Sequence, residues 1–433
     1  MRIRSRVLLA LTVAVVTVAS VVTVVVFRTP TDATASRVHG PAHWLGAWGA
    51  DMTTGGRSFH DQTIREVVRP TISGTSIRLH VTNWLGSDPL ALGEVDVAVQ
   101  SGGGSASRGS SRAVRFGGST SVIVPAGQDL VSDPVPMRVK VRQNLLVSIY
   151  LPGTVEVSMW HSAGLNYSYV SAPGDHARAA TTEEYPTRTG ADFFVDGLDV
   201  ETETSDATVV AFGDSITDGT CTGFGKNTRW PDDLSKLIGP NYGVVDAGIA
   251  GNRVLTDAAQ AQQGLPAEQR FVHDALGVPG VRVIVLLEGI NDIRPMAGPY
   301  GYRLTAADLI AGYQDLIALA HRAHVRIVGG TLLPYQHAWE DSAAGEAVRV
   351  QVNRWILTSG AFDGVIDFAS AVGLHSNPAA YDHRYDCGDH LHPNASGAKV
   401  LATDAATLVE RLAAEPPLTD ATAAPSPAAS LAQ

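Results

Sequence analysis

The chain has 433 residues, of which 45% are hydrophobic, 6% aromatic and 17% charged. This length exceeds what one hydrophobic core usually supports, so we expect two globular units with appendages. The formal net charge is −11, and no long run of lysine or arginine interrupts it. That balance argues against nucleic acid as a partner, because such binding depends on neutralising phosphates. The two cysteines form no C-x-x-C pair and no H-E-x-x-H segment is present, so the sequence predicts no metal site.

Residues 1–43 have the pattern of an export signal and a linker. Arg2, Arg4 and Arg6 precede residues 7–27, an uncharged and mostly apolar run of 21 residues that is long enough to span a bilayer as a helix. The segment at 33–35, Ala-Thr-Ala, resembles the cleavage site of a signal peptide. We therefore expect either an uncleaved anchor or a cleaved peptide. In both cases the arginines stay inside and the rest of the chain is exported, with membrane contact only through the apolar run.

Short strands separated by turn residues are expected throughout residues 44–200. Residues 76–83 alternate between apolar and polar side chains, and similar runs recur at 95–99, 122–124, 137–141 and 145–149. No amphipathic helix lies between these runs. The spacing predicts an antiparallel β-sandwich of the jelly-roll kind, with a glycine- and serine-rich loop at 101–111.

After an acidic stretch at 199–206, the pattern changes to strands that alternate with helices. Apolar runs typical of strands buried on both faces lie at 207–212, 244–246, 281–287, 325–332 and 365–368. Residues 305–323 have apolar side chains at helical spacing behind a capping pair, Thr305 and Asp308. Residues 206–414 are thus expected to form a flavodoxin-like, doubly wound, five-stranded parallel sheet. Residues 415–433, rich in proline and alanine, are expected to be a disordered tail.

A serine stands where the first of these strands ends. Residues 209–219 read V-V-A-F-G-D-S-I-T-D-G, so Ser215 follows a buried strand directly, in the position of a nucleophile. Taken alone, such a serine is more often a helix N-cap or a turn residue. Asp214 is expected to brace the turn through hydrogen bonds rather than to transfer protons.

Three further segments follow other strands of the same sheet, at 248–252, 289–292 and 389–392. In a parallel sheet all of them lie at one edge. Ester hydrolysis through a serine needs a base, a group that orients the base, and donors for the oxyanion. His392 supplies the base and Asp389, in a turn, the orienting carboxylate. Asn291 offers a side-chain donor and Gly251 a backbone donor, although each alone is more often a turn or loop residue.

With these four segments the chain resembles the SGNH or GDSL hydrolase family. The G-D-S start, the G-x-N-D segment and the D-x-x-H ending occur in order between residues 207 and 414. The family's four block residues match Ser215, Gly251, Asn291 and His392. The resemblance implies an oxyanion hole of the Ser215 and Gly251 amides with the Asn291 side chain, and a reaction without metal or cofactor. The neighbouring His390 is the alternative base, but the family spacing favours His392.

Other residues near the motifs leave alternatives open. Cys221 follows the nucleophile and Cys387 precedes the base, so their loops approach one another if Ser215 and His392 meet. A disulfide between them is our hypothesis for an exported protein, with two separate thiols as the alternative. His337 and Trp339 follow the fourth strand, where they either line the substrate cleft or belong to a surface loop.

The function expected from the sequence is that of an exported serine esterase with an acyl-serine intermediate. Its substrates are expected to be short-chain esters or O-acylated glycans, because a β-sandwich before an SGNH unit resembles the arrangement in some carbohydrate acetylesterases. The alternatives are an acyltransferase onto glycan hydroxyls, a lipase or lysophospholipase, and a carbohydrate-binding protein whose hydrolase unit is inactive. Oligomeric state is not predicted.

Overall fold

The computed structural model describes residues 41–294 and 304–419. The predicted export segment at 7–27 lies outside the described residues, as does the predicted tail from residue 420 onward. Within the part of the chain that is described, no helix combines the length and the apolar character needed to cross a membrane.

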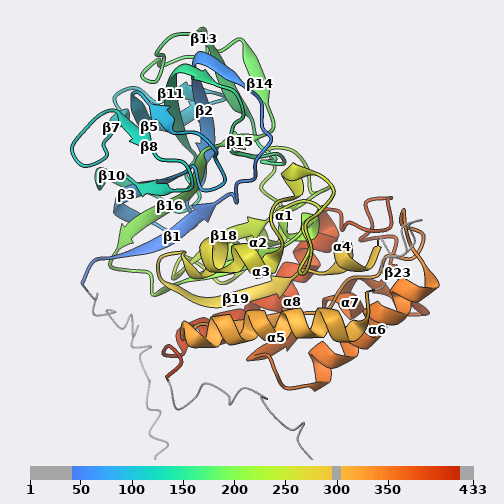
Figure 1. The fold of residues 1–433 in the computed structure, drawn as a ribbon. Coiled ribbons are helices and arrows are strands. Elements are labelled where there is room, and N and C mark those ends of the chain that lie inside the picture. Colours follow the sequence, from blue (N-terminus) through green and yellow to red (C-terminus); the bar gives the residue numbers. More distant parts are fainter. Residues whose placement is uncertain (1–40, 295–303, 420–433) are drawn as a thin grey trace, which may run out of the picture. The chain divides into compact units, whose positions relative to one another are not determined.

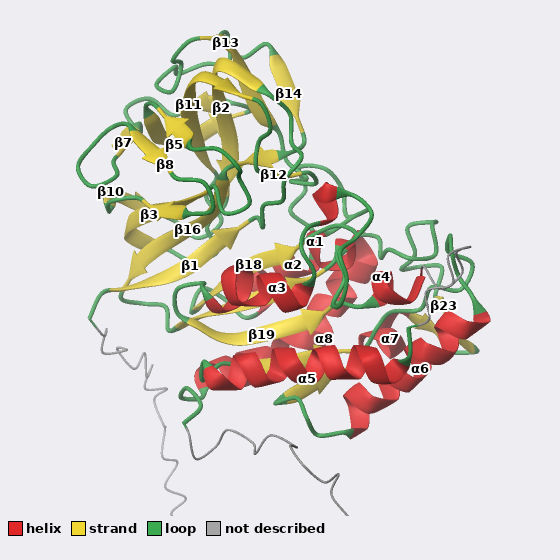
Figure 2. Ribbon diagram, in the orientation of Figure 1, coloured by secondary structure: helices red, strands yellow, loops and turns green. Residues whose placement is uncertain are grey.

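Residues 43–202, which we call the β region, contain antiparallel strands and no helix among the described residues (Figures 1 and 2). One sheet has the order β1-β16-β3-β10, with β9 beside β3, and the other has the order β14-β13-β2-β11-β5-β6, with β7 beside β5. The strands of the first sheet are β1 (His43–Gly49), β3 (Gly74–Thr82), β9 (Asp129–Val131), β10 (Val135–Val139) and β16 (Val195–Thr202). Those of the second are β2 (Phe59–Val68), β5 (Val95–Gly102), β6 (Ser105–Ala106), β7 (Arg112–Val114), β11 (Leu145–Val155), β13 (Ser168–Pro173) and β14 (Thr187–Thr189). Two short pairs complete the region, β4 (Leu90–Leu92) with β8 (Val122–Val124), and β12 (Trp160–His161) with β15 (Asp192–Phe193).

One hydrophobic core fills the β region, and alternation along the strands supplies it. In β3, Ile77, Leu79 and Val81 are fully buried, whereas Arg78 and His80 between them are partly exposed. The alternation predicted for residues 76–83 is therefore confirmed, and so is the antiparallel class of this half of the chain. β16 extends to Thr202, so the strand includes the first residues of the acidic stretch at 199–206.

Residues 207–414, which we call the α/β region, are built on a parallel sheet of order β18-β17-β19-β20-β21. Numbered within this region, the order is 2-1-3-4-5, which is the flavodoxin-like order that the sequence predicts. The strands are β17 (Ala207–Gly213), β18 (Tyr242–Gly248), β19 (Val281–Leu287), β20 (Arg326–Gly330) and β21 (Gly364–Ile366). A small hairpin, β22 (Gly373–Leu374) with β23 (Asn377–Tyr381), precedes the last helix.

Helices cover both faces of this sheet, which is why β17 is buried along its whole length. α2 packs with α8, and α5 packs with α3 and α6 (Figures 1 and 2). The helices are α1 (Ser215–Asp218), α2 (Trp230–Leu237), α3 (Ala267–Phe271), α4 (Ile290–Ile293), α5 (Ala306–Arg322), α6 (Ala343–Thr358), α7 (Phe368–Val372) and α8 (Ala395–Ala414). A 3-10 turn (Ala261–Gln263) and a π turn (Val272–Leu276) flank α3.

The β region and the α/β region touch along β1 and belong to one compact unit of the chain. The Gly46 amide donates to the Pro279 carbonyl at 2.8 Å. A Cβ at Gly46 would lie 2.4 Å from a methyl group of Val278, so only glycine permits this approach. The boundaries predicted for two separate domains stay a prediction.

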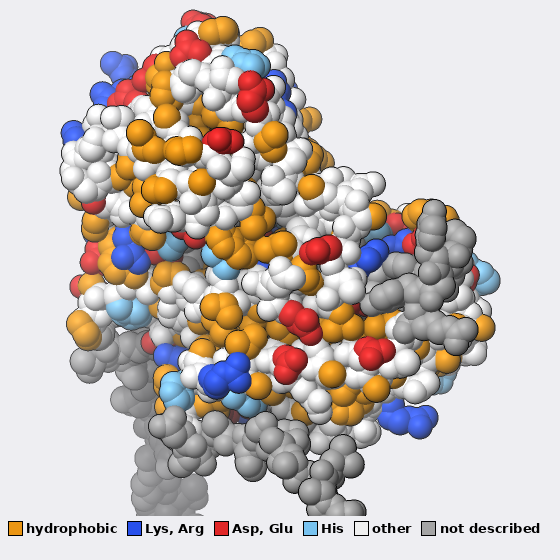
Figure 3. All heavy atoms as spheres, viewed as in Figure 1, with side chains coloured by type: hydrophobic (Ala, Val, Ile, Leu, Met, Phe, Trp, Pro, Cys, Tyr) orange, Lys and Arg blue, Asp and Glu red, His pale blue; other side chains and the backbone are white. Residues whose placement is uncertain are grey.

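The surface carries charges of both signs. On the face drawn in Figure 3, lysine and arginine side chains are scattered among acidic and hydrophobic ones rather than gathered into one patch.

Candidate active site

Ser215 is placed by the end of β17 and the start of α1. Asp214 is the N-cap of α1, and its carboxyl accepts a hydrogen bond from the Ile216 amide at 2.9 Å. Gly219 ends the helix in a left-handed conformation (φ 91°), as is typical of a C-cap glycine. Ser215 is only 6% exposed. The nucleophile predicted from the sequence is therefore the first residue of a single helical turn at the carboxyl end of β17.

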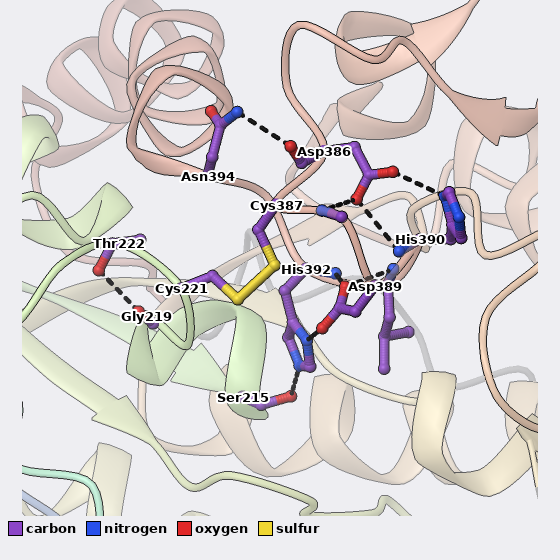
Figure 4. Close-up of a disulfide and its surroundings, with 12 residues drawn as sticks. Ser215, Gly219, Cys221, Thr222, Asp386, Cys387, Asp389, His390, His392 and Asn394 are labelled. Atoms are coloured by element: carbon purple, nitrogen blue, oxygen red, sulfur yellow. Dashed lines mark hydrogen bonds and ion pairs between the residues drawn. A yellow bond between two sulfur atoms is a disulfide. The ribbon is translucent and has the colours of Figure 1, made fainter.

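His392 and Asp389 reach Ser215 from the loop before α8. The Ser215 Oγ lies 2.8 Å from His392 Nε2, and His392 Nδ1 lies 2.6 Å from Asp389 Oδ2 (Figure 4). Asp389 Oδ1 also accepts the backbone amides of Leu391 and His392, each at 2.9 Å. These bonds create the turn on which the predicted contact between Asp389 and His392 depends.

The carboxyl group of Asp389 is ionised over a wide pH range. Partial burial alone would raise its pKa, but hydrogen bonds from the His392 ring and from the backbone amides of His392 and Leu391 outweigh this effect and hold the pKa well below its usual value. A carboxylate in this position fixes the ring orientation and stabilises the imidazolium that forms when His392 takes a proton.

Three hydrogen-bond donors are available beside the serine. Among the described residues, the backbone amides of Ser215 and Gly251 have no acceptor. Gly251 has φ 81°, a left-handed backbone conformation that favours glycine. The Asn291 side-chain amide donates one hydrogen to the Asn252 carbonyl at 3.0 Å. Its second hydrogen is not used by any described residue.

Cys221 and Cys387 form a disulfide (Figure 4). The Cys387 amide also donates to the His392 carbonyl at 3.1 Å. The bond therefore joins the loop that follows α1 to the loop that carries the base, as the sequence hypothesis states.

The chain matches the GDSL-like Lipase/Acylhydrolase family over residues 211–400. Residues 211–400 form an SGNH domain. The enzyme class of this family is carboxylic ester hydrolase, and the β-rich region precedes the domain in the chain. No curated protein matches the chain.

Several solved structures are similar to part of the chain. An aryl esterase from M. smegmatis is 16% identical, with 48% of this chain and 99% of that protein covered and a TM-score of 0.40. A carbohydrate acetylesterase from Sinorhizobium meliloti is 14% identical, with 48% and 99% covered and a TM-score of 0.38. A GDSL-like lipase from Bacteroides thetaiotaomicron is 16% identical, with 48% and 89% covered and a TM-score of 0.36. At these values the likeness does not identify a substrate.

The alternative residues considered for the SGNH site lie elsewhere or have other partners. His390 Nδ1 lies 2.7 Å from Asp386, and the structure gives it no contact with Ser215 (Figure 4). Asp214 is 1% exposed, and its carboxyl caps α1 as expected. Burial raises the pKa of Asp214 to about 6, against the opposing hydrogen bond from the Ile216 amide.

Two residues of the loop after β20 lie close to these groups. The His337 ring packs edge-on against the His390 ring, with centroids 5.9 Å apart. Trp339 is 79% exposed, and its carbonyl accepts from Arg294, which also donates to the Asn291 side-chain oxygen at 3.2 Å. Trp339 is therefore a surface residue, and Arg294 connects it to Asn291 through hydrogen bonds.

Sequence reasoning missed the buried polar residues that support the SGNH motifs. Asp292 is 1% exposed and accepts the amides of Val254 and Leu255 at 2.8 and 3.1 Å, so it shapes the loop that follows Gly251. Arg270 is also 1% exposed and bonds to the ends of three strands. Asp292 belongs to the G-x-N-D segment, and that motif could have indicated its role. Arg270 lies in a short helix without any motif.

Two groups of described residues have the spacing of metal ligands. In the first, Cys221 is in the disulfide and the other members are Asp389 and His392 of the site itself. In the second, ligand atoms of Asp129, Asp196 and His273 lie within 4.8 Å of one another. Both ring nitrogens of His273 already have carboxyl partners, with Asp129 at 2.8 Å and Asp274 at 2.5 Å. The second group is therefore an ion-pair cluster around His273.

Proposed function

We propose that this chain is an exported serine esterase that hydrolyses short-chain carboxylic esters, including those of O-acylated glycans, through an acyl-serine intermediate. The observation that carries the proposal is the unbroken series of hydrogen bonds from Asp389 through His392 to the Ser215 hydroxyl. A serine hydroxyl is a weak nucleophile unless a base takes its proton, and this geometry provides the base and the group that orients it.

The first half of the reaction forms the acyl-enzyme. Ser215 Oγ bonds to the ester carbonyl carbon while its proton passes to His392 Nε2. The carbonyl oxygen becomes an oxyanion that the amides of Ser215 and Gly251 and the Asn291 side chain stabilise. The intermediate then collapses, the bond to the alcohol oxygen breaks, and the alcohol leaves with the proton from His392.

The second half returns the enzyme to its starting state. Water gives a proton to His392 and its oxygen bonds to the acyl carbon. When that intermediate collapses, the bond to Ser215 Oγ breaks, the serine regains the proton and the acid is released. Asp389 stays ionised throughout and stabilises the imidazolium in both halves. The described chain therefore has a group for each proton transfer.

Export is supported by two features. The apolar run at 7–27 follows three arginines, and disulfides such as Cys221–Cys387 persist mainly in oxidising compartments. N-terminal sequencing of protein from the membrane fraction and from the medium separates an uncleaved anchor from a cleaved signal peptide. Protein found only in the cytoplasm would contradict export.

The polar side chains beside Ser215, His392 and Asp389 support a substrate ester whose alcohol part is polar, such as a sugar. Asp386, His390 and Arg294 are polar and lie near these three residues, and Trp339, whose carbonyl accepts from Arg294, is an exposed aromatic residue. A panel of p-nitrophenyl esters from acetate upward, run beside acetylated xylan, tests this. The proposal predicts the highest kcat/KM for acetyl esters and release of acetate from the glycan. A preference for long acyl chains would instead indicate a lipase.

Hydrolysis and acyl transfer differ only in the acceptor of the second half. Incubation with p-nitrophenyl acetate and added oligosaccharide, followed by quantification of free acetate and acetylated sugar, measures the partition. We expect acetate as the main product. Acetylated oligosaccharide as the main product would indicate a transferase. The Ser215→Ala variant is expected to be inactive in every assay.

A further inference from the structure

Arg270 ties together three strand ends of the SGNH domain. Its guanidinium donates to the Gly213 carbonyl at 2.9 Å, to the Ala247 carbonyl at 3.1 Å and to the Glu288 carboxyl at 3.3 Å. Gly213 ends β17, Ala247 lies in β18, and Glu288 follows β19. Arg270 Nε also donates to the Asn252 side-chain oxygen at 2.8 Å. The three loops that begin at these strand ends carry the nucleophile, Gly251 and Asn291.

Asn252 passes this support on to the oxyanion donors. It is fully buried, and its side-chain amide nitrogen donates to the backbone carbonyls of Gln263 and Leu265, each at 2.7 Å. Its own carbonyl accepts from the Asn291 side chain at 3.0 Å. The direction in which the Asn291 amide points is therefore set by a residue that Arg270 holds.

The closest carboxyl partner of Arg270 comes from the β region. Asp51, in the loop after β1, accepts from Arg270 Nη1 at 2.8 Å, against 3.2 Å for Asp274 and 3.3 Å for Glu288. Asp51 is 6% exposed. Removing it would leave part of a buried guanidinium without its nearest acceptor, which is costly.

A second side chain of the β region reaches the helix of the nucleophile. His161 in β12 is 4% exposed, and its Nε2 lies 3.0 Å from Asp218, the last residue of α1. The other oxygen of Asp218 accepts the amide of Ala250, which precedes Gly251, at 3.2 Å. His161 Nδ1 lies 2.9 Å from the Asp51 carbonyl, so the two contacts between the regions adjoin one another.

We propose that Asp51 and His161 are positioning residues of the esterase, and that the β region is a working part of the catalytic unit rather than a detachable binding module. The inference rests on the proposed function. Asp51 acts through Arg270 and Asn252 on the donor Asn291, and His161 acts through Asp218 on α1 and the Gly251 loop. Neither touches the reacting atoms.

The chemistry is sensitive to such support because oxyanion donors and nucleophile work only within a narrow range of positions. A displacement of about 1 Å that arises far from the reacting atoms costs roughly 10²-fold in rate. Because these donors act mainly on the oxyanion of the transition state, a loss of positioning lowers kcat and leaves KM nearly unchanged.

The test compares Asp51→Ala and His161→Ala with a matched pair, Asp199→Ala and His80→Ala. Asp199 is 2% exposed and lies 2.8 Å from the His80 ring, so it is also a buried carboxyl paired with an imidazole. The hydrogen-bond partners of both control residues lie within the β region. We expect the first pair to lower kcat on p-nitrophenyl acetate roughly 10- to 100-fold at unchanged KM. The control pair is expected to lower the Tm without lowering kcat.

A double-mutant cycle with Asn291→Ala separates positioning from general destabilisation. If Asp51 acts through the oxyanion donor, Asp51→Ala costs less in kcat when Asn291 is already alanine, whereas Asp199→Ala leaves kcat unchanged in both backgrounds. Asp51→Val, which removes both acceptor oxygens but keeps a branched side chain, replaces the alanine variant if that variant does not fold.

The outcomes distinguish this inference from the proposed function. Activity that survives Ser215→Ala overturns the proposed function. If Ser215→Ala is inactive but Asp51→Ala or Asp51→Val keeps the kcat of the wild type, or if its effect adds fully to that of Asn291→Ala, the positioning role is wrong and the esterase assignment stands.

Discussion

At the scale of single residues, the proposed nucleophile and the proposed base are each held by an aspartate that accepts backbone amides. Asp214 caps the helix of Ser215, and Asp389 accepts the amides of Leu391 and His392 while it contacts the His392 ring. Both aspartates therefore stabilise a main-chain turn, in addition to any effect of their charge on the neighbouring side chains. The side chains of serine and base meet because two turns place them.

Much of this site was predictable at the residue scale. Ser215 and Asn291 each follow a strand whose hydrophobic run is plain in the sequence, and their meeting at one sheet edge followed from the topology. His392 follows the short last strand of that sheet only after a helix and a hairpin. The buried support was not predictable. A single arginine in a five-residue helix has the pattern of a solvated side chain, and the partners of Arg270 come from positions as distant in sequence as Asp51.

The Asn291 side chain gives the first prediction. Asn291→Ala is expected to lower kcat by roughly 10²- to 10³-fold, because one oxyanion donor is lost, with little change in KM. The measurement is steady-state hydrolysis of p-nitrophenyl acetate. Asn83→Ala is the matched control, since this buried side-chain amide also donates to a backbone carbonyl, that of Asp88 at 2.8 Å, and its acceptors lie in the β region. Equal losses of kcat in both variants would remove Asn291 from the oxyanion hole.

At the scale of elements, the sequence predicted long elements better than short ones. The helix expected at 305–323 is α5, with Thr305 and Asp308 bonded as a capping box and Leu309, Tyr313 and Leu316 buried. Apolar residues at regular spacing along the whole of this helix are enough to predict it from the sequence. The sequence predicts only a boundary at the acidic stretch 199–206 and no strand there, whereas β16 runs to Thr202. Asp199 lies in that strand because Arg78 and His80 of the neighbouring strand neutralise it, and this pairing across strands leaves no local pattern.

The disulfide gives a prediction at this scale. Cys221 and Cys387 are 166 residues apart in sequence and join the loops on either side of the catalytic contact. The double variant Cys221→Ser with Cys387→Ser is expected to lose about 2–5 kcal/mol in the free energy of unfolding, because a long loop is no longer closed. Urea unfolding of the two proteins measures this. Equal unfolding free energies would contradict it.

A reducing agent supplies the control for catalysis. Dithiothreitol is expected to lower kcat/KM of the wild type, because the loops of serine and base lose their covalent link, and to leave the double variant unchanged. If fully reduced wild-type protein keeps its kcat/KM, the disulfide has no part in positioning these loops.

At the scale of the whole molecule, several carboxyl groups of the α/β region are buried and have raised pKa values. Burial raises the pKa of Asp246 to about 7, with Arg229 opposing it, and raises the pKa of Asp214 and Asp292 to about 6 each. In the unfolded chain such groups release their protons near pH 4. Between about pH 4 and 7 the folded state thus holds more protons than the unfolded state, and stability falls as pH rises.

We predict that the free energy of unfolding is larger at pH 5 than at pH 8. His161 acts in the same direction. Although burial alone would lower its pKa, Asp218 raises it to about 9, so its contribution is complete below about pH 6.5 and is lost as pH rises through 9. Urea unfolding at both values measures the difference. Asp246→Asn is expected to flatten the decline between pH 5 and 7, and a decline as steep as that of the wild type would contradict the assignment to Asp246.

The relation between the β region and the SGNH domain is the part of the molecule that the sequence described least. A change of periodicity near residue 200 separates two patterns, but it says nothing of the contacts across them. Two contacts join positions more than two hundred residues apart, that of Gly46 with Val278 and that of Asp51 with Arg270. None of these residues belongs to a sequence motif. Such contacts are found only when the tertiary fold is known.

The central claim, that the Ser215 hydroxyl is acylated during turnover, is tested most directly by covalent labelling. A p-nitrophenyl phosphonate mimics the tetrahedral intermediate and stays on the nucleophile, so mass spectrometry of the digested protein locates it. We predict one phosphonate per chain, on the peptide that contains Ser215, with esterase activity lost in proportion to labelling. Complete inactivation with this peptide unmodified, or labelling that continues in Ser215→Ala, would contradict the claim.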